Sequence, residues 1–71
     1  MYLQYREIME PVLSKVVAQK VKDMRDGGLS YRGVAERCAP WTGSPHWHNQ
    51  TIGEEWCILA AEVLGIERFD E

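Results

Sequence analysis

One short stretch of the chain combines a helix break, a helix cap and the beginning of an amphipathic pattern, and it limits the folds open to the protein. Gly27 and Gly28 can adopt positive φ angles without a Cβ clash, so they predict the end of a helix. Ser30 predicts the start of the next helix, because its hydroxyl can accept a hydrogen bond from an unpaired amide one turn later. The apolar residues that follow share one helical face: Tyr31, Val34, Ala35 and Cys38. The stretch therefore predicts two helices joined by a tight turn.

An apolar stripe at helical spacing precedes this turn and predicts a first long helix from about Pro11 to Arg25. Pro11 suits the first helical position, where its missing amide donor is not needed. The stripe consists of Val12, Leu13, Val16, Val17, Val21 and Met24. Residues 1–10 are expected to form an N-terminal arm or a short helix, which either folds back or pairs with a second copy.

A further helix is predicted to begin at Thr51. Residues 51–54 read Thr-Ile-Gly-Glu, which is a capping box, and Gly65 suits a left-handed C-cap. The apolar stripe between them contains Ile52, Trp56, Leu59, Ala60, Val63 and Leu64. Pro40 and Pro45 predict an extended loop before this helix.

These elements predict an all-α fold. We expect a small three- to four-helix domain of helix-turn-helix type that spans residues 1–71, with an extended loop between its second and third helices and an acidic tail at 66–71. No apolar run approaches the roughly 20 residues that a membrane span needs, so we expect a cytoplasmic protein without a membrane partner.

Residues 28–37 read Gly-Leu-Ser-x-x-x-Val-Ala-Glu-Arg, which resembles the start of the second helix in two groups of DNA-binding domains. One group is the Cro/repressor-like (XRE-like) family, and the other is the small helical domain of large serine recombinases. The resemblance extends from Val17 to Ile66. It implies a helix-turn-helix protein that binds double-stranded DNA, as a small transcriptional regulator or a phage-type accessory factor.

The two resemblances imply different registers for the element that reads DNA. Gly43, Trp47 and Thr51-Ile52 follow the order of the recombinase-like insertion, in which the first turn of the next helix reads DNA. Residues 61–66 resemble the end of an XRE-like domain, in which that helix is a supporting one and the reading element lies within residues 44–50. Both registers remain open at this point.

Both registers place the candidate DNA contacts in one segment: Ser44, His46, His48, Asn49, Gln50 and Thr51. Asn and Gln side chains can pair bidentately with adenine, and Thr can contact a thymine methyl group. The alternative is that Asn49 and Thr51 serve as helix caps and that Gln50 is solvated. The candidate phosphate contacts are Arg32, Lys20, Lys22 and Arg25. A homodimer is expected to read two half-sites, because one such module buries little surface.

The charge of the chain is unevenly distributed, although its net charge is -3. Residues 13–53 contain six Lys or Arg against three Asp or Glu, whereas the last 18 residues contain one Arg against six Asp or Glu. The first of these segments could offer a weakly positive face to DNA. The acidic one favours a different function, a protein-protein interaction module or inhibitor that uses this segment together with the loop tryptophans Trp41 and Trp47.

Cysteine and histidine residues raise the question of a metal or catalytic site. His46 and His48 could join Cys38 and Cys57 around zinc, but their spacing matches no standard zinc pattern. Both cysteines fall on apolar helix faces, where Cys usually behaves as a small hydrophobic residue rather than forming a disulfide. A chain of 71 residues leaves little room for a substrate cleft. We therefore predict no metal, no cofactor and no catalytic residues.

Overall fold

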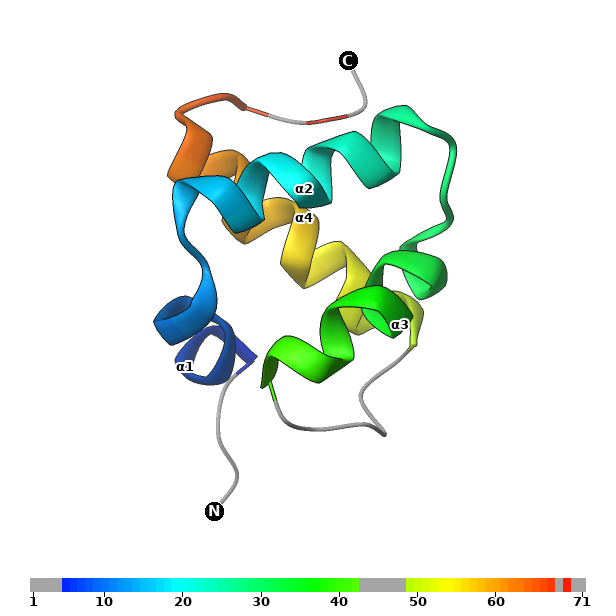
Figure 1. Cartoon of the computed structure of the whole chain (residues 1–71), viewed down its shortest axis with the longest axis horizontal. Helices are drawn as coiled ribbons and strands as arrows, with labels where there is room; N and C mark the ends of the chain where they lie inside the picture. The colour runs from blue at the N-terminus through cyan, green and yellow to red at the C-terminus, as the bar shows by residue number, and fades with distance from the viewer. Residues whose placement is uncertain (1–4, 43–48, 68, 70–71) are drawn as a thin grey trace.

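The computed structural model describes residues 5–42, 49–67 and 69. Its described part contains four α-helices, a 3-10 turn and no strand. The helices are α1 (Tyr5–Met9), α2 (Lys15–Asp26), α3 (Tyr31–Thr42) and α4 (Gln50–Leu64), and the turn η1 (Glu10–Val12) joins α1 to α2 (Figure 1). The predicted all-α class is confirmed.

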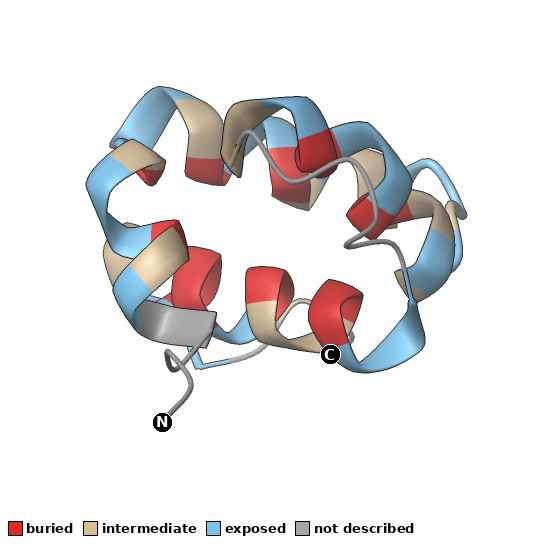
Figure 2. Ribbon diagram, turned by 90° about the horizontal axis from the view of Figure 1, so that it is seen from below, coloured by how far each residue is buried: buried red, intermediate tan, exposed pale blue. Residues whose placement is uncertain are grey.

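Helix α4 is the centre of the molecule, because α1, α2 and α3 all pack against it. It contributes seven buried residues, Ile52, Gly53, Trp56, Cys57, Leu59, Ala60 and Ala61. The buried segments of the other helices face the same interior (Figure 2). Met9 of α1 is fully buried in this core, so the short first helix folds back onto the domain. No helix in the described residues is both long and apolar enough to cross a membrane.

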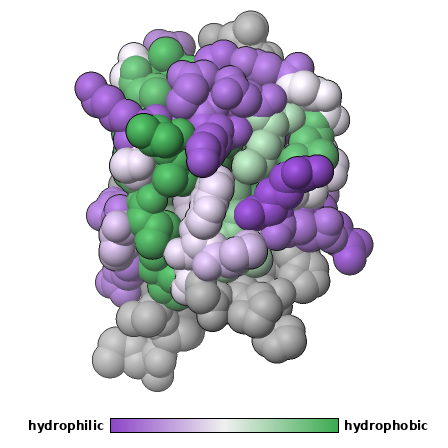
Figure 3. Space-filling model, viewed as in Figure 1, coloured by the Kyte–Doolittle hydropathy of each residue, from purple (hydrophilic) through white to green (hydrophobic). Residues whose placement is uncertain are grey.

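Helix α2 begins later than the sequence predicted. Pro11 lies in η1, and the helix starts at Lys15 because the Ser14 hydroxyl accepts a hydrogen bond from the Val17 amide at 3.3 Å. Val16 was expected in the apolar stripe, but 66% of its surface is exposed. The reason is that the buried face of α2 is centred on Ala18 and Val21, and Val16 lies on the far side of the helix. The exterior of the protein thus includes apolar residues. On the face shown in Figure 3, such residues lie beside strongly hydrophilic side chains.

The predicted turn between α2 and α3 is confirmed. Gly28 adopts a φ of 91°, and the Ser30 hydroxyl accepts a hydrogen bond from the Gly33 amide at 3.1 Å. Arg25 closes the turn, because its Nη1 donates to the Leu29 carbonyl oxygen at 2.6 Å. Tyr31 and Cys38 belong to the apolar face of α3 as expected, and Arg32 is exposed.

Helix α3 runs further than the prolines suggested. Pro40 was expected to lie in a loop, but it is an exposed residue inside α3, which continues to Thr42. The last turn is held by Trp41, whose ring packs edge-on against the ring of buried Trp56 at a centroid distance of 6.0 Å. The Thr42 hydroxyl also donates to the Ala39 carbonyl oxygen at 2.8 Å. Packing thus compensates for the amide that Pro40 lacks.

Helix α4 starts at Gln50 rather than at Thr51. Its N-cap is Asn49, whose Oδ1 accepts a hydrogen bond from the Ile52 amide at 3.0 Å. The predicted capping box is therefore wrong, since Glu54 accepts a hydrogen bond from the Gln50 side chain instead. At the other end, Gly65 has a φ of 75° and forms the predicted left-handed C-cap.

Candidate nucleic-acid interface

The first turns of α3 and α4 touch through their backbones. Gly53 makes this approach possible, because a Cβ atom at this position would overlap the carbonyl oxygen of Tyr31. Figure 1 shows the start of α4, in yellow, beside the start of α3, in green. The two helix N-termini consequently lie next to each other.

Both of these N-termini are capped by polar side chains. The Ser30 hydroxyl caps α3 and the Asn49 amide oxygen caps α4, and each cap satisfies one amide of the first turn. The remaining first-turn amides have no carbonyl partner within their own helix. Partial positive charge from two helices therefore accumulates at one place, which favours a bound anion such as a phosphate.

Several predicted DNA contacts belong to these adjoining turns. We call this region the cap edge and define it as Ser30, Arg32, Asn49, Gln50 and Thr51. All five residues are exposed. The contact between Gly53 and Tyr31 thus brings together candidates from two segments that are distant in sequence.

The side chains of the cap edge are held to different degrees. Arg32 has 69% of its side chain exposed, and its Nε lies 3.6 Å from Glu36 Oε1, so this ion pair is loose. Gln50 Nε2 donates to Glu54 Oε1 at 3.0 Å. Asn49 acts as a helix cap, which is the alternative role considered for it from the sequence.

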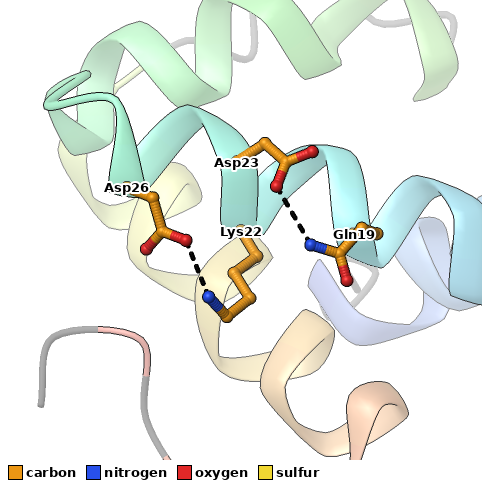
Figure 4. Close-up of polar contacts among 4 residues, drawn as sticks. All are labelled: Gln19, Lys22, Asp23 and Asp26. Atoms are coloured by element: carbon orange, nitrogen blue, oxygen red, sulfur yellow. Dashed lines mark hydrogen bonds and ion pairs between the residues drawn. The ribbon is translucent and has the colours of Figure 1, made fainter.

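The basic residues predicted on α2 differ in their surroundings. Lys20 is exposed. Lys22 donates to Asp26 Oδ2 at 2.7 Å (Figure 4), and this hydrogen bond raises the pKa of the Lys22 ammonium group. Arg25 is engaged in the turn, where its guanidinium also stacks over the Tyr31 ring at 4.1 Å. Lys20 is consequently the most accessible of the three.

The remaining predicted contacts, Ser44, His46 and His48, lie outside the described residues, as does Trp47. Within the described part of the chain, no three His, Cys, Asp or Glu side chains are grouped to hold a metal ion.

The two cysteines are buried and not joined by a disulfide. Burial is the main cause that raises the pKa of the Cys38 thiol to about 12, and the neighbouring Cys57 adds to it. Cys38 is therefore a protonated thiol near neutral pH. It lacks the thiolate character that a nucleophile or a metal ligand needs.

Sequence reasoning missed the role of Gly53. The available signal was a glycine inside a predicted helix, where it costs stability unless packing requires it. The partner of the close approach, the Tyr31 backbone, could be identified only from the three-dimensional arrangement.

No protein-family model, curated protein or solved structure matches this chain.

Proposed function

We propose that the protein binds double-stranded DNA with sequence preference, as a small transcriptional regulator or a phage-type accessory factor of helix-turn-helix type. The observation that carries this proposal is the meeting of two helix N-termini at the cap edge. The protein works without catalysis, by positioning polar side chains on the duplex.

The phosphate backbone is the first target of the cap edge. Amides of the first turns of α3 and α4 donate to phosphate oxygens, as helix N-termini commonly do. Arg32 exchanges its loose contact with Glu36 for a phosphate, because the exposed pair contributes little stability. These contacts fix the position of the protein on DNA and carry no sequence information.

The burial of α4 restricts its contact with DNA to its exposed parts. The buried residues begin at Ile52, whereas Gln50 and Thr51 in the first turn are exposed. Base reading belongs to residues 44–50 in the repressor-like register and to this first turn in the recombinase-like register. Gln50 contacts bases in both registers.

Carboxylates limit the strength of this interface. Glu54 and Glu55 follow the cap edge on α4, and both are partly exposed. We therefore expect modest affinity for a single copy and a shallow dependence on salt. Two copies on adjacent half-sites provide the surface that tight binding needs.

Fluorescence anisotropy with mixed-sequence duplex DNA at low salt tests the proposal. We expect binding that weakens as salt is added, because counterions are released from the phosphates. Arg32→Ala should weaken binding to every sequence, whereas Gln50→Ala should change the preference among sequences. Arg37→Ala is the matched control, since Arg37 is exposed on a different face of α3. Absence of salt-sensitive binding overturns the proposal.

A further inference from the structure

A groove with an acidic border runs along the outer side of α4. Its volume is about 410 Å³, and its lining includes Ile58, Tyr31 and Phe69. Its carboxylates come from Glu54, Glu62 and Glu67, and none of the described lining residues is Lys or Arg. We call this feature the acidic groove.

An apolar side chain is exposed inside this groove. Ile58 is exposed to 51%, although its neighbours Cys57 and Leu59 are buried. Val16 and Ile66 are also exposed, but neither lines the groove. Single exposed apolar residues are common on proteins, so exposure alone does not indicate a partner. The position of Ile58 in a hollow between carboxylates is what distinguishes it.

The charge of the groove selects the kind of partner. Three carboxylates around an apolar floor repel phosphate, so this surface disfavours nucleic acid. The same arrangement attracts lysine or arginine, and a partner that also supplies an apolar side chain covers Ile58.

The spacing of the groove residues selects the shape of the partner. Glu54, Ile58 and Glu62 follow one another at four-residue intervals, so they form one ridge on α4. The two carboxylates are separated by eight residues, or about 12 Å along the helix axis. A partner helix matches this ridge when it carries one basic residue four positions before, and another four positions after, an apolar residue.

We propose that the acidic groove is a docking site for a basic amphipathic helix of a protein partner, which places an apolar side chain on Ile58 and a Lys or Arg opposite each of Glu54 and Glu62. This inference does not require DNA binding, because none of the residues that line the groove belongs to the cap edge. Glu54 links the two surfaces, since it accepts the hydrogen bond from Gln50. Tyr31 and Glu54 lie at the end of the groove next to the first turns of α3 and α4, so the docked helix begins where the DNA surface ends.

A synthetic peptide tests this docking on the intact protein. The probe is an alanine-based helix of about 16 residues with a central leucine and a lysine four positions to each side. Two-dimensional NMR should show shifts of the Ile58 and Phe69 resonances when the probe is added. Replacement of the two lysines by glutamates should abolish these shifts. Equal binding of the glutamate peptide, or no binding of either peptide at millimolar concentration, overturns the proposal.

Variants of the protein separate apolar from electrostatic recognition. Ile58→Ser should weaken binding of the lysine peptide about tenfold, because an apolar contact is lost from an exposed site that the fold does not need. Glu54→Gln combined with Glu62→Gln should weaken it about fivefold and remove most of its salt dependence. Val16→Ser and Glu7→Gln are the matched controls on exposed sites outside the groove, and each should leave binding within twofold. Loss of binding in the controls as well as in the groove variants contradicts the assignment.

The groove could instead be covered by a second copy of this chain. Sedimentation equilibrium of the protein without peptide distinguishes the two cases. We expect Ile58→Ser to leave the oligomeric state unchanged. If the protein self-associates and Ile58→Ser abolishes that association, the occupant is another copy and the proposal of a separate partner is wrong.

Discussion

The first turn of α4 and the outer ridge of the same helix differ in every property that matters for binding. The first turn approaches α3 so closely that only glycine fits at position 53, and its backbone amides concentrate positive potential. The ridge formed by Glu54, Ile58 and Glu62 carries negative charge around an exposed apolar side chain. One helix thus supports the core and provides two surfaces of opposite character.

This difference is the basis for proposing two kinds of partner for a chain of 71 residues. The positive potential at the cap edge comes mainly from backbone geometry and does not require many basic side chains. The acidic surface comes from side chains on the solvent side of α4. The net charge of the chain reveals neither surface, because it is a sum over the whole molecule and does not say where the charges lie.

The largest expected effect comes from adding one methyl group between α3 and α4. Gly53→Ala should lower the free energy of unfolding by about 3 kcal/mol or more, because the new Cβ overlaps the Tyr31 backbone, which cannot move without separating the helices. Chemical denaturation followed by circular dichroism measures this loss.

Gly27→Ala is the control for this substitution. Gly27 has a φ of -78°, and an added Cβ would lie 3.3 Å from the Asp23 carbonyl oxygen, so its cost should stay below about 1 kcal/mol. Equal effects of the two substitutions would show that the close approach of the first turns does not exist.

High pH should destabilise the core shared by both surfaces. Burial raises the pKa of the folded Cys38 thiol from its ordinary value of 9.0 to about 12, so above pH 9 the unfolded chain loses a proton that the native protein keeps. Stability should therefore fall as pH rises from about 9 toward 12, by up to about 1.4 kcal/mol per pH unit. Denaturation curves at several alkaline pH values measure the slope. Cys38→Ala should make that slope shallower, and an unchanged slope would contradict the assignment to this thiol.

Substitution of two helix caps distinguishes a loss of stability from a loss of DNA contact. Asn49→Ala and Ser14→Ala should each cost about 1 kcal/mol of stability, because each removes the side-chain acceptor of a first-turn amide. Only Asn49 belongs to the cap edge. Anisotropy should therefore show weaker DNA binding for Asn49→Ala and unchanged binding for Ser14→Ala when both are measured well below their melting temperatures. Equal DNA binding by the two variants would limit Asn49 to a structural role.

The smallest effect on stability is expected for Arg32→Ala. The pair with Glu36 is more than half exposed and 3.6 Å long, so its loss should change the free energy of unfolding by less than about 0.5 kcal/mol. DNA affinity should nevertheless fall, and the slope of log affinity against log salt should decrease by about 1. A variant with the salt slope of the unchanged protein would exclude Arg32 from phosphate contact.

The local signals in the sequence predicted the turn and most helix faces. Gly28 and Ser30 fixed the break between α2 and α3, because their effects depend on the backbone and one nearby amide. Gly65 is the C-cap of α4 and Trp56 is a core residue, as the sequence predicted. Such features need no information about distant parts of the chain.

Predictions failed where two local signals competed or where tertiary packing decided the outcome. Helix α2 begins after its N-cap Ser14 and not at Pro11. Helix α4 is capped by Asn49 and not by Thr51. Pro40 stayed inside α3, whose last turn is anchored by Trp41 packed on Trp56. Of the candidate site, the sequence supplied the residues, but the adjacency of the two N-termini depends on a contact between α3 and α4 that no local pattern encodes.

An NMR titration with mixed-sequence duplex DNA at low salt tests whether the adjoining helix N-termini bind phosphate. We expect the amide resonances of Tyr31, Arg32, Gln50 and Thr51, which are first-turn amides that the Ser30 and Asn49 side chains do not cap, to shift together and to return as salt is added. Resonances of Ile58 and Glu62 in the acidic groove should stay in place. Shifts confined to other surfaces, or none at all, would contradict the claim that the adjoining helix N-termini form a phosphate-binding edge.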